Sequence, residues 1–298
     1  MSNVLTELST AMATAVSQAD SGIVRVEGRR RFGATGIVWH ADGLILTANH
    51  VLSRDDGLNV GLSNGERVSA SLVGRDPSTD LALLKADAND LTPLTEGNKQ
   101  ELGVGNLVLA LGRPGRTVQA TLGIISALGD GWRTRLGGEI DRYMQTDVVM
   151  YPGFSGGPLV DTAGQLVGLN SSALGRGASM TIPTATLARV ADALQAHGRV
   201  QRGYLGVSTQ RVHLPDNLKA ELEQKRGLLV VSVENDSPAA KAGLTLGDTL
   251  VSFANSPVQS HDDLLALLAG DVVGTAVPAK FVRGGQVHTT EITVVARS

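Results

Sequence analysis

The stretch Tyr151-Pro152-Gly153-Phe154-Ser155-Gly156-Gly157-Pro158-Leu159-Val160 places one serine among three glycines, directly before an apolar run. Glycine accepts positive φ and has no Cβ, so the backbone here can turn sharply around the serine. The N–H groups of Gly153 and Ser155 can then point the same way. An exposed nucleophile beside two donors for an oxyanion is what acyl transfer requires. A glycine-rich turn with an ordinary surface serine fits the same residues equally well.

A serine nucleophile needs a base and a carboxylate elsewhere in the chain. Of six histidines, His50 alone ends an apolar run, Leu44–Val51, that is typical of a strand. Asp80 directly precedes the apolar run Leu81–Leu84, where it can be held partly buried and orient an imidazole. The other histidines lie in polar surroundings and are interpreted as solvated. The order His50, Asp80, Ser155 is the order of the chymotrypsin-type triad.

Four segments together resemble the HtrA (Deg) family of trypsin-like serine proteases, which carry a C-terminal PDZ domain. The resemblance extends over nearly the whole chain and implies a mostly β fold, with a chymotrypsin-like double β-barrel protease domain followed by a PDZ domain. In such a fold the triad lies in the cleft between two six-stranded barrels. The segments are Leu46-Thr47-Ala48-Asn49-His50-Val51, Asp80-Leu81-Ala82-Leu83-Leu84-Lys85, Gln145-Thr146-Asp147 and Gly153-Phe154-Ser155-Gly156-Gly157-Pro158-Leu159-Val160.

The length of 298 residues exceeds a typical single core, so two domains are expected. We predict a protease domain over 1–198, including an amphipathic helix within 1–20 that docks on the body. A polar linker follows over 199–202, and the PDZ domain covers 203–298. A content of 42% hydrophobic and 18% charged residues indicates a globular protein rather than a disordered one.

The charge and hydropathy of the chain exclude several classes of partner. A net charge of −3 argues against nucleic acid, and Arg29-Arg30-Arg31 is interpreted as a solvated turn. No apolar run reaches the roughly 20 residues that span a bilayer. The chain has no cysteine, which excludes disulfides and thiol catalysis. No metal and no cofactor are expected.

The N-terminal residues lack the basic start and unbroken apolar core of a signal peptide. As written, the sequence therefore predicts a cytoplasmic protein, whereas the resemblance implies an extracytoplasmic or periplasmic one if the sequence is trimmed. Members of the family commonly form trimers through aromatic residues in the N-terminal segment. Residues 1–31 contain no aromatic side chain, so a homo-oligomer such as a trimer stays an open alternative.

The resemblance implies that Ser155 attacks the scissile carbonyl, His50 accepts its proton and Asp80 orients the imidazole. The N–H groups of Gly153 and Ser155 form the oxyanion hole. Met150, Ala173 and Leu174 line the pocket for the residue before the cut, which favours a small or medium aliphatic side chain. Phe154 departs from the family pattern, which usually has asparagine at this position. Its bulky ring can change the conformation of the loop.

The C-terminal part resembles a bacterial PDZ domain from end to end. In that family a loop corresponding to Tyr204-Leu205-Gly206-Val207 captures a peptide C-terminus through backbone N–H groups, and an exposed strand pairs with the peptide. The helix carrying Leu264 and Leu268 is expected to lie beside this loop. The peptide-binding residues expected are Tyr204, Leu205, Gly206, Val207, Leu264 and Leu268.

The function predicted is that of a serine endopeptidase that cleaves unfolded or misfolded proteins through an acyl-enzyme, with a PDZ domain for peptide C-termini. The alternative is a protease-fold chaperone or binding module with little proteolytic activity. An active-site fluorophosphonate label distinguishes the two, because it requires an activated serine.

Overall fold

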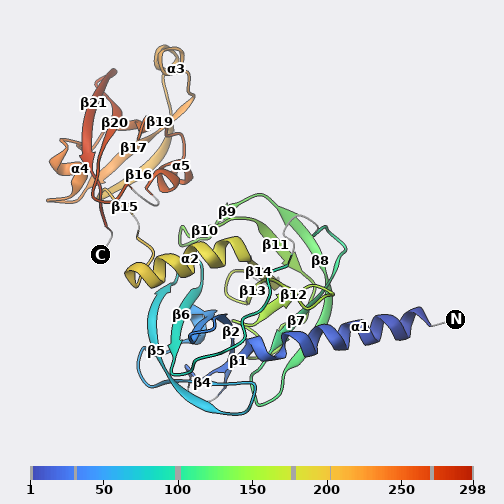
Figure 1. Ribbon diagram of the computed structural model, residues 1–298. Coiled ribbons are helices and arrows are strands. Elements are labelled where there is room, and N and C mark those ends of the chain that lie inside the picture. The colour runs from blue at the N-terminus through green and yellow to red at the C-terminus, as the bar shows by residue number, and fades with distance from the viewer. Residues whose placement is uncertain are drawn as a thin grey trace. The chain divides into compact units, whose positions relative to one another are not determined.

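The computed structural model describes residues 3–29, 32–97, 102–175, 179–201, 203–268 and 272–296. The chain forms two compact units, residues 1–200 and residues 201–298 (Figure 1). Strands dominate both units, and the first contains two closed barrels. The two closed barrels and the strand-rich second unit confirm the predicted mostly β fold, with a double β-barrel followed by a second domain.

The first barrel has the strand order β1-β2-β3-β6-β5-β4 and closes where β1 pairs with β4. The hairpin between β2 and β3 turns at Asp42-Gly43, where Gly43 has φ +96°. Fully buried aliphatic side chains such as Ile37, Leu46 and Leu83 fill the interior. The strands are β1 (Ile23–Val26), β2 (Ala34–His40), β3 (Leu44–Ala48), β4 (Leu58–Gly61), β5 (Arg67–Asp76) and β6 (Leu81–Ala86).

The second barrel has the order β11-β14-β13-β12-β7-β8 and encloses a smaller core that includes Phe154. The helix α2 (Thr184–His197) packs its apolar face on the core of the first barrel and ends at Gly198, with φ +69°. The barrel strands are β7 (Leu107–Gly112), β8 (Gln119–Gly129), β11 (Tyr143–Thr146), β12 (Pro158–Val160), β13 (Leu166–Ser171) and β14 (Ser179–Pro183). A separate two-stranded sheet pairs β9 (Trp132–Arg133) with β10 (Glu139–Ile140).

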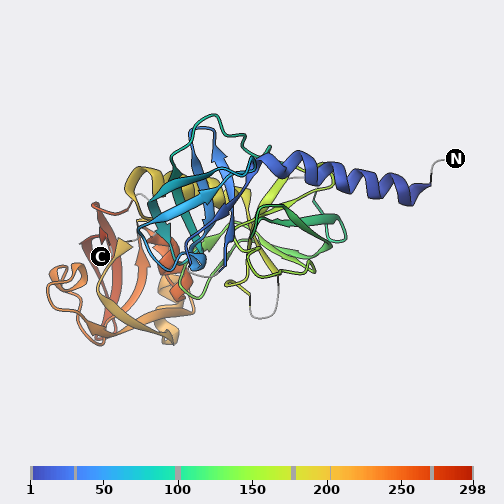
Figure 2. The same ribbon diagram turned by 90° about the horizontal axis from the view of Figure 1, so that it is seen from below.

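The N-terminal helix α1 (Val4–Ala19) docks only through its C-terminal half. Ala15 and Ala19 are buried in a cluster with residues of β1, β7 and β12, whereas Val4 and Leu5 are exposed. Figures 1 and 2 show the N-terminal turns extending away from the barrels. The prediction of an amphipathic helix is right, but docking stops at about the middle of the helix. None of the described helices is long and apolar enough to cross a membrane.

The second unit is a sheet of order β16-β17-β18-β20-β21 with β19 added beside β18. Ser237 caps α4, and Ser260 forms a capping box with Asp263 at the start of α5. Its helices are α3 (Asp216–Leu222), α4 (Pro238–Lys241) and α5 (His261–Leu267). Its strands are β15 (Gly203–Tyr204), β16 (Val207–His213), β17 (Arg226–Val233), β18 (Thr249–Phe253), β19 (Ser256–Pro257), β20 (Ala276–Arg283), β21 (Gln286–Thr293) and β22 (Val295–Ala296).

Candidate active site

Adjacent strands of the first barrel bring His50 and Asp80 together. His50 lies in the short 3-10 helix η2 (Asn49–Val51) that follows β3, and Asp80 immediately precedes β6. The register pairs Ala48 with Leu81, so the two loops leave the barrel at the same end. Asp80 has φ +59°, a conformation that aspartate tolerates better than most residues. A backbone bond from Asn49 N to Asp80 O, 2.9 Å long, ties the loops together.

The carboxylate of Asp80 is 3% exposed and accepts three hydrogen bonds. His50 Nδ1 lies 2.7 Å from Oδ2, and the His50 backbone N–H donates to Oδ1 over 2.9 Å. Ser171 Oγ, at the end of β13, donates to Oδ2 over 2.5 Å. Because a carboxylate can only accept, the bond fixes the proton of His50 on Nδ1. His50 Nε2 is therefore left as the basic nitrogen.

Ser155 lies in the turn before β12 of the second barrel. The hydroxyl of Ser172 lies between it and His50. Ser155 Oγ lies 2.9 Å from Ser172 Oγ, which lies 3.4 Å from His50 Nε2. Within the described chain Ser155 has no direct hydrogen bond to His50. Such contacts are often long before substrate binds and tighten later. Ser155 is 8% exposed, so the expectation of an exposed serine at the crest of the turn is wrong.

The turn before Ser155 has the conformation that the glycines predict. Gly153 has φ +92°, and Phe154 N donates to Tyr151 O over 3.0 Å to close the turn. Gly156 has φ +88°, and a Cβ there would lie 2.1 Å from Thr35 O. In the described part of the chain, neither the Gly153 N–H nor the Ser155 N–H donates a hydrogen bond. Both N–H groups are thus available to an oxyanion formed beside Ser155.

The ring of Phe154 points away from the nucleophile into the core of the second barrel. It is fully buried, and its edge meets Tyr151 at a ring-centroid distance of 5.8 Å. Gly112 on β7 provides the space, since a Cβ there would lie 2.6 Å from Phe154 Cδ1. The bulky ring at this position is therefore accommodated by packing, and it leaves the turn around Gly153 regular.

A cavity of about 250 Å³ is lined by residues that include His50, Met150, Ser155 and Ser172. Ala173 and Leu174 do not line it. Ala173 is exposed, and the half-buried Leu174 packs against the core of the first barrel. Of the three residues expected to surround the substrate side chain, the structure thus places Met150 in the cavity of the nucleophile.

Arg29 also lines this cavity, although the sequence predicts a solvated turn there. Its guanidinium donates to the carbonyl oxygens of Val51, over 3.1 Å, and His50, over 2.6 Å. Arg30 and Arg31 lie outside the described residues. Asp147, in the third of the four segments that carry the family resemblance, accepts a hydrogen bond of 2.6 Å on its Oδ1 from Ile124 N.

In the second unit, backbone hydrogen bonds hold the loop 204–207, which is predicted to bind the carboxylate of a peptide. Leu205 O accepts from Ala239 N over 2.9 Å, and Gly206 O accepts from Glu234 N over 2.8 Å. Among the described residues, the N–H groups of Leu205 and Gly206 donate no hydrogen bond. Tyr204, the last residue of β15, and Val207, the first residue of β16, flank them.

The helix beside this loop presents a different leucine from those expected. Leu264 and Leu268 are 6% and 7% exposed and belong to the domain core, whereas Leu265 is 41% exposed. His261, at the start of α5, places Nε2 2.8 Å from Thr209 O on β16. On α5, His261 thus contacts β16 and Leu265 is exposed, and adjacent leucines in the sequence do not reveal which of them is buried.

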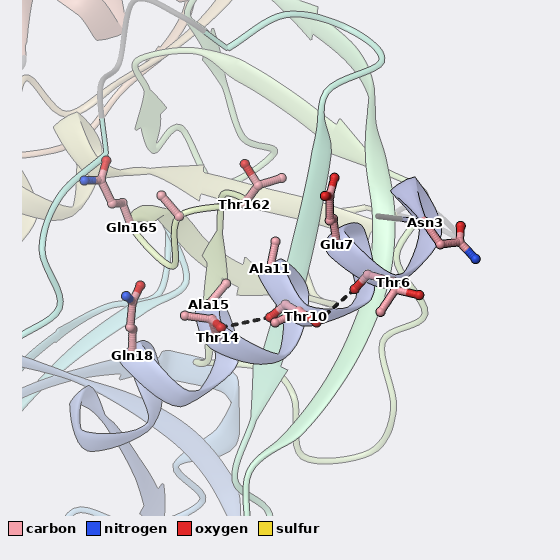
Figure 3. Close-up of a pocket in the computed structure, with 11 residues that line it drawn as sticks. Asn3, Thr6, Glu7, Thr10, Ala11, Thr14, Ala15, Gln18, Thr162 and Gln165 are labelled. Carbon is pink, nitrogen blue, oxygen red and sulfur yellow. Dashed lines mark hydrogen bonds between the residues drawn. The ribbon is translucent and has the colours of Figure 1, made fainter. Parts of the chain in front are cut away.

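A larger groove of about 860 Å³ runs along α1 and is remote from this chemistry (Figure 3). Small and uncharged side chains such as Thr10, Ala11 and Thr162 line it, and Glu7 is its one ionisable lining residue among those described. Within the described ranges, no group of histidine, aspartate and glutamate side chains is arranged to hold a metal ion.

Two family models match the chain, a trypsin-like peptidase domain over residues 34–169 and a PDZ domain over residues 203–294. A probable periplasmic serine endoprotease, DegP-like, from Pseudomonas fulva is 40% identical over 266 residues, which cover 87% of this chain and 55% of the relative. A relative of the same description from Marinomonas sp. is 37% identical over 91% of this chain and 58% of its own. The chain thus spans somewhat more than half the length of these curated relatives.

Solved structures match both units. The serine endoprotease from Yersinia pestis has a TM-score of 0.80 and 33% identity, covering 96% of this chain and 98% of that chain. The HtrA-type protease AlgW with decapeptide has a TM-score of 0.79 and 30% identity, covering 96% of this chain and 99% of that one.

Proposed function

Since this chain belongs to the HtrA family of trypsin-like serine endoproteases with a PDZ domain, we propose that it cleaves unfolded or misfolded proteins through an acyl-enzyme. The observation that carries the proposal is the arrangement around His50, whose Nδ1 lies 2.7 Å from Asp80 Oδ2. This bond leaves Nε2 facing the Ser155 hydroxyl through Ser172, at 3.4 Å and 2.9 Å. No other group of the described chain combines a nucleophile, a base and an orienting carboxylate in this way.

In the proposed reaction, the Ser155 hydroxyl breaks its hydrogen bond with Ser172 and its Oγ attacks the scissile carbonyl carbon. His50 Nε2 takes the proton of this hydroxyl. The carbonyl oxygen becomes negative and accepts hydrogen bonds from the N–H groups of Gly153 and Ser155. His50 then gives its proton to the leaving amine as the C–N bond breaks, which yields the acyl-enzyme. A water molecule then attacks the acyl-enzyme with His50 as the base, and the product with the new carboxyl terminus is released.

We expect purified protein to cut casein mainly after valine, alanine, isoleucine or leucine. Met150 contributes apolar surface to the cavity that Ser155 lines, and no aspartate or glutamate lines that cavity among the described residues. The measurement is mass spectrometry of the product termini. Intact casein after prolonged incubation contradicts the proposed activity, whereas abundant cuts mainly after lysine or arginine contradict only the specificity.

We expect residues 203–298 to bind peptide C-termini that end in an apolar residue. The titration uses the full chain carrying Ser155→Ala, so that the peptide is not cut. The loop N–H groups of Leu205 and Gly206 are unused, and a carboxylate can accept both. Amidation of the terminal carboxylate should weaken binding at least about tenfold, because charge-assisted bonds contribute about 1.5–3 kcal/mol each. Equal affinity of acid and amide rejects carboxylate capture.

The compartment and the assembly are also proposals. The curated relatives are named as periplasmic enzymes, and we place this protein in an extracytoplasmic compartment rather than in the cytoplasm. Val4 and Leu5 on the projecting turns of α1 are exposed apolar side chains, and they support a homo-oligomer, such as a trimer, in which a second copy covers them.

A further inference from the structure

Thr35, on β2 of the first barrel, is bonded to both residues that supply the proposed oxyanion hole. Its backbone N–H donates to Ser155 O over 3.3 Å, and its hydroxyl donates to Gly153 O over 2.6 Å. The side chain is fully buried, so these bonds do not compete with water. Thr35 cannot be identified from the sequence, because one hydroxyl in a β-strand has no distinctive sequence signal.

The hydroxyl of Thr35 has its hydrogen-bond roles fixed by its partners. A carbonyl oxygen can only accept, so the hydroxyl proton is given to Gly153 O. The same oxygen accepts a bond of 2.8 Å from the Arg113 backbone N–H. A rotation of the hydroxyl away from Gly153 would leave the partly buried Gly153 carbonyl without this partner, which is costly.

Hydrogen bonds fix one peptide group of the turn at both its C=O and its N–H. The peptide between Gly153 and Phe154 has its C=O bound by Thr35 and its N–H bound by Tyr151 O, at 3.0 Å. A Cβ on Gly153 would lie 2.6 Å from Pro114 Cβ and 2.7 Å from Gly33 O, so the turn is also closely packed. The neighbouring Gly153 N–H therefore has little freedom to turn away from the nucleophile.

Arg113 supports Thr35 from a rigid position. It is 2% exposed, which is rare for arginine, and its guanidinium donates four hydrogen bonds. Nε donates to Ile23 O over 2.8 Å, and Nη1 donates to Arg116 O over 2.7 Å. Nη2 donates to Asp20 O over 3.0 Å and to Asp20 Oδ1 over 2.6 Å. Asp20 directly follows α1, so the support reaches the end of the N-terminal helix.

We propose that Thr35, held by Arg113, is a positioning residue that keeps the oxyanion hole formed in the absence of substrate. The inference rests on the proposed function, because an oxyanion hole has a role only if Ser155 attacks a carbonyl. Thr35 does not touch the reacting atoms. It acts through Gly153, and its removal should therefore weaken transition-state stabilisation more than substrate binding.

The main test compares Thr35→Val, which has nearly the same shape but no hydroxyl, with Thr35→Ser, which keeps it. With a fluorogenic peptide that has an apolar residue before the cut, Thr35→Val should lower kcat about 100-fold. The loss of one oxyanion donor typically costs about 10²–10³ in kcat. KM should change less than about threefold, and Thr35→Ser should recover at least about one third of kcat.

A binding measurement separates positioning from general damage. In a peptide boronic acid, boron accepts an electron pair from Ser155 Oγ, becomes tetrahedral and places an oxygen in the oxyanion hole. Its affinity should fall in Thr35→Val by about the same factor as kcat. The matching product peptide with a free carboxylate occupies the same subsites without a tetrahedral centre, and its affinity should change by less than about threefold.

The matched control is Thr186→Val on α2. Thr186 is also fully buried, donates to Asp141 Oδ2 over 2.6 Å and accepts from Asp141 N over 3.0 Å. Thr186→Val should lower the melting temperature about as much as Thr35→Val does, and it should leave kcat unchanged. If both variants lose activity equally, or if Thr35→Val retains wild-type kcat and boronate affinity, the positioning role is overturned. A wild-type protein without turnover instead overturns the proposed function itself.

Discussion

Ser155→Ala should leave casein intact and lower kcat by at least about 10⁴, the scale on which loss of one member of a triad is measured. The alanine has no atom that can form the acyl-enzyme, so only the weak catalysis from the oxyanion hole and binding remains. The same variant should not react with a fluorophosphonate probe that labels the wild-type protein. Casein digestion and probe labelling are measured on the same preparation.

The fold of this variant should stay intact. Ser155 is nearly buried, and the change removes its hydrogen bond of 2.9 Å with Ser172 Oγ and a long one of 3.4 Å from Ser172 N, a loss worth about 1 kcal/mol. We expect the melting temperature to fall by no more than about 4 °C. Ser71→Ala on the exposed surface of β5 is the control and should keep both cleavage and labelling. Casein cleavage by Ser155→Ala at a rate near that of the wild type would remove Ser155 from the mechanism.

Asp80→Asn should lower kcat by about 10⁴ at neutral pH, the effect that this substitution has in trypsin. The carboxylate now accepts from His50 Nδ1, the His50 N–H and Ser171 Oγ. An amide nitrogen at Oδ2 would donate instead, which favours the imidazole tautomer with its proton on Nε2. In that tautomer His50 cannot take the proton of Ser155.

The control for this variant is Asp76→Asn, in the same loop. Asp76 is also buried and accepts bonds from Ser78 N, Ser78 Oγ and Thr79 Oγ1. Its replacement should lower stability without a large loss of kcat, because it does not touch His50. Steady-state kinetics and thermal unfolding of both variants provide the comparison. If Asp80→Asn and Asp76→Asn lose kcat to the same extent, Asp80 has no orienting role beyond the stability of the loop.

The barrels, α2 and the PDZ-like unit could be predicted because alternating apolar strands and glycine turns leave regular patterns. The short helix α3 (Asp216–Leu222) was not predicted, since seven residues with one buried leucine give almost no periodic signal. For the same reason the sequence did not distinguish Leu264, in the core, from Leu265, which is exposed.

Within the candidate site, residues with distinctive sequence surroundings were found and supporting residues were missed. His50, Asp80 and Ser155 each border a strand in a recognisable motif. Thr35 and Ser172 have no such motif, and their roles depend on which strands become neighbours after folding. Hydrogen bonds between segments about 120 residues apart, such as Thr35 Oγ1 to Gly153 O, cannot be deduced from spacing along one chain.

The division of the site between two barrels makes activity depend on the contact between the barrels. His50 and Asp80 are carried by one barrel and Ser155 by the other. An opening that parts the barrels separates the base from the nucleophile, even while each barrel keeps its strands. Activity is therefore a more sensitive measure of the packing between the barrels than the content of secondary structure is.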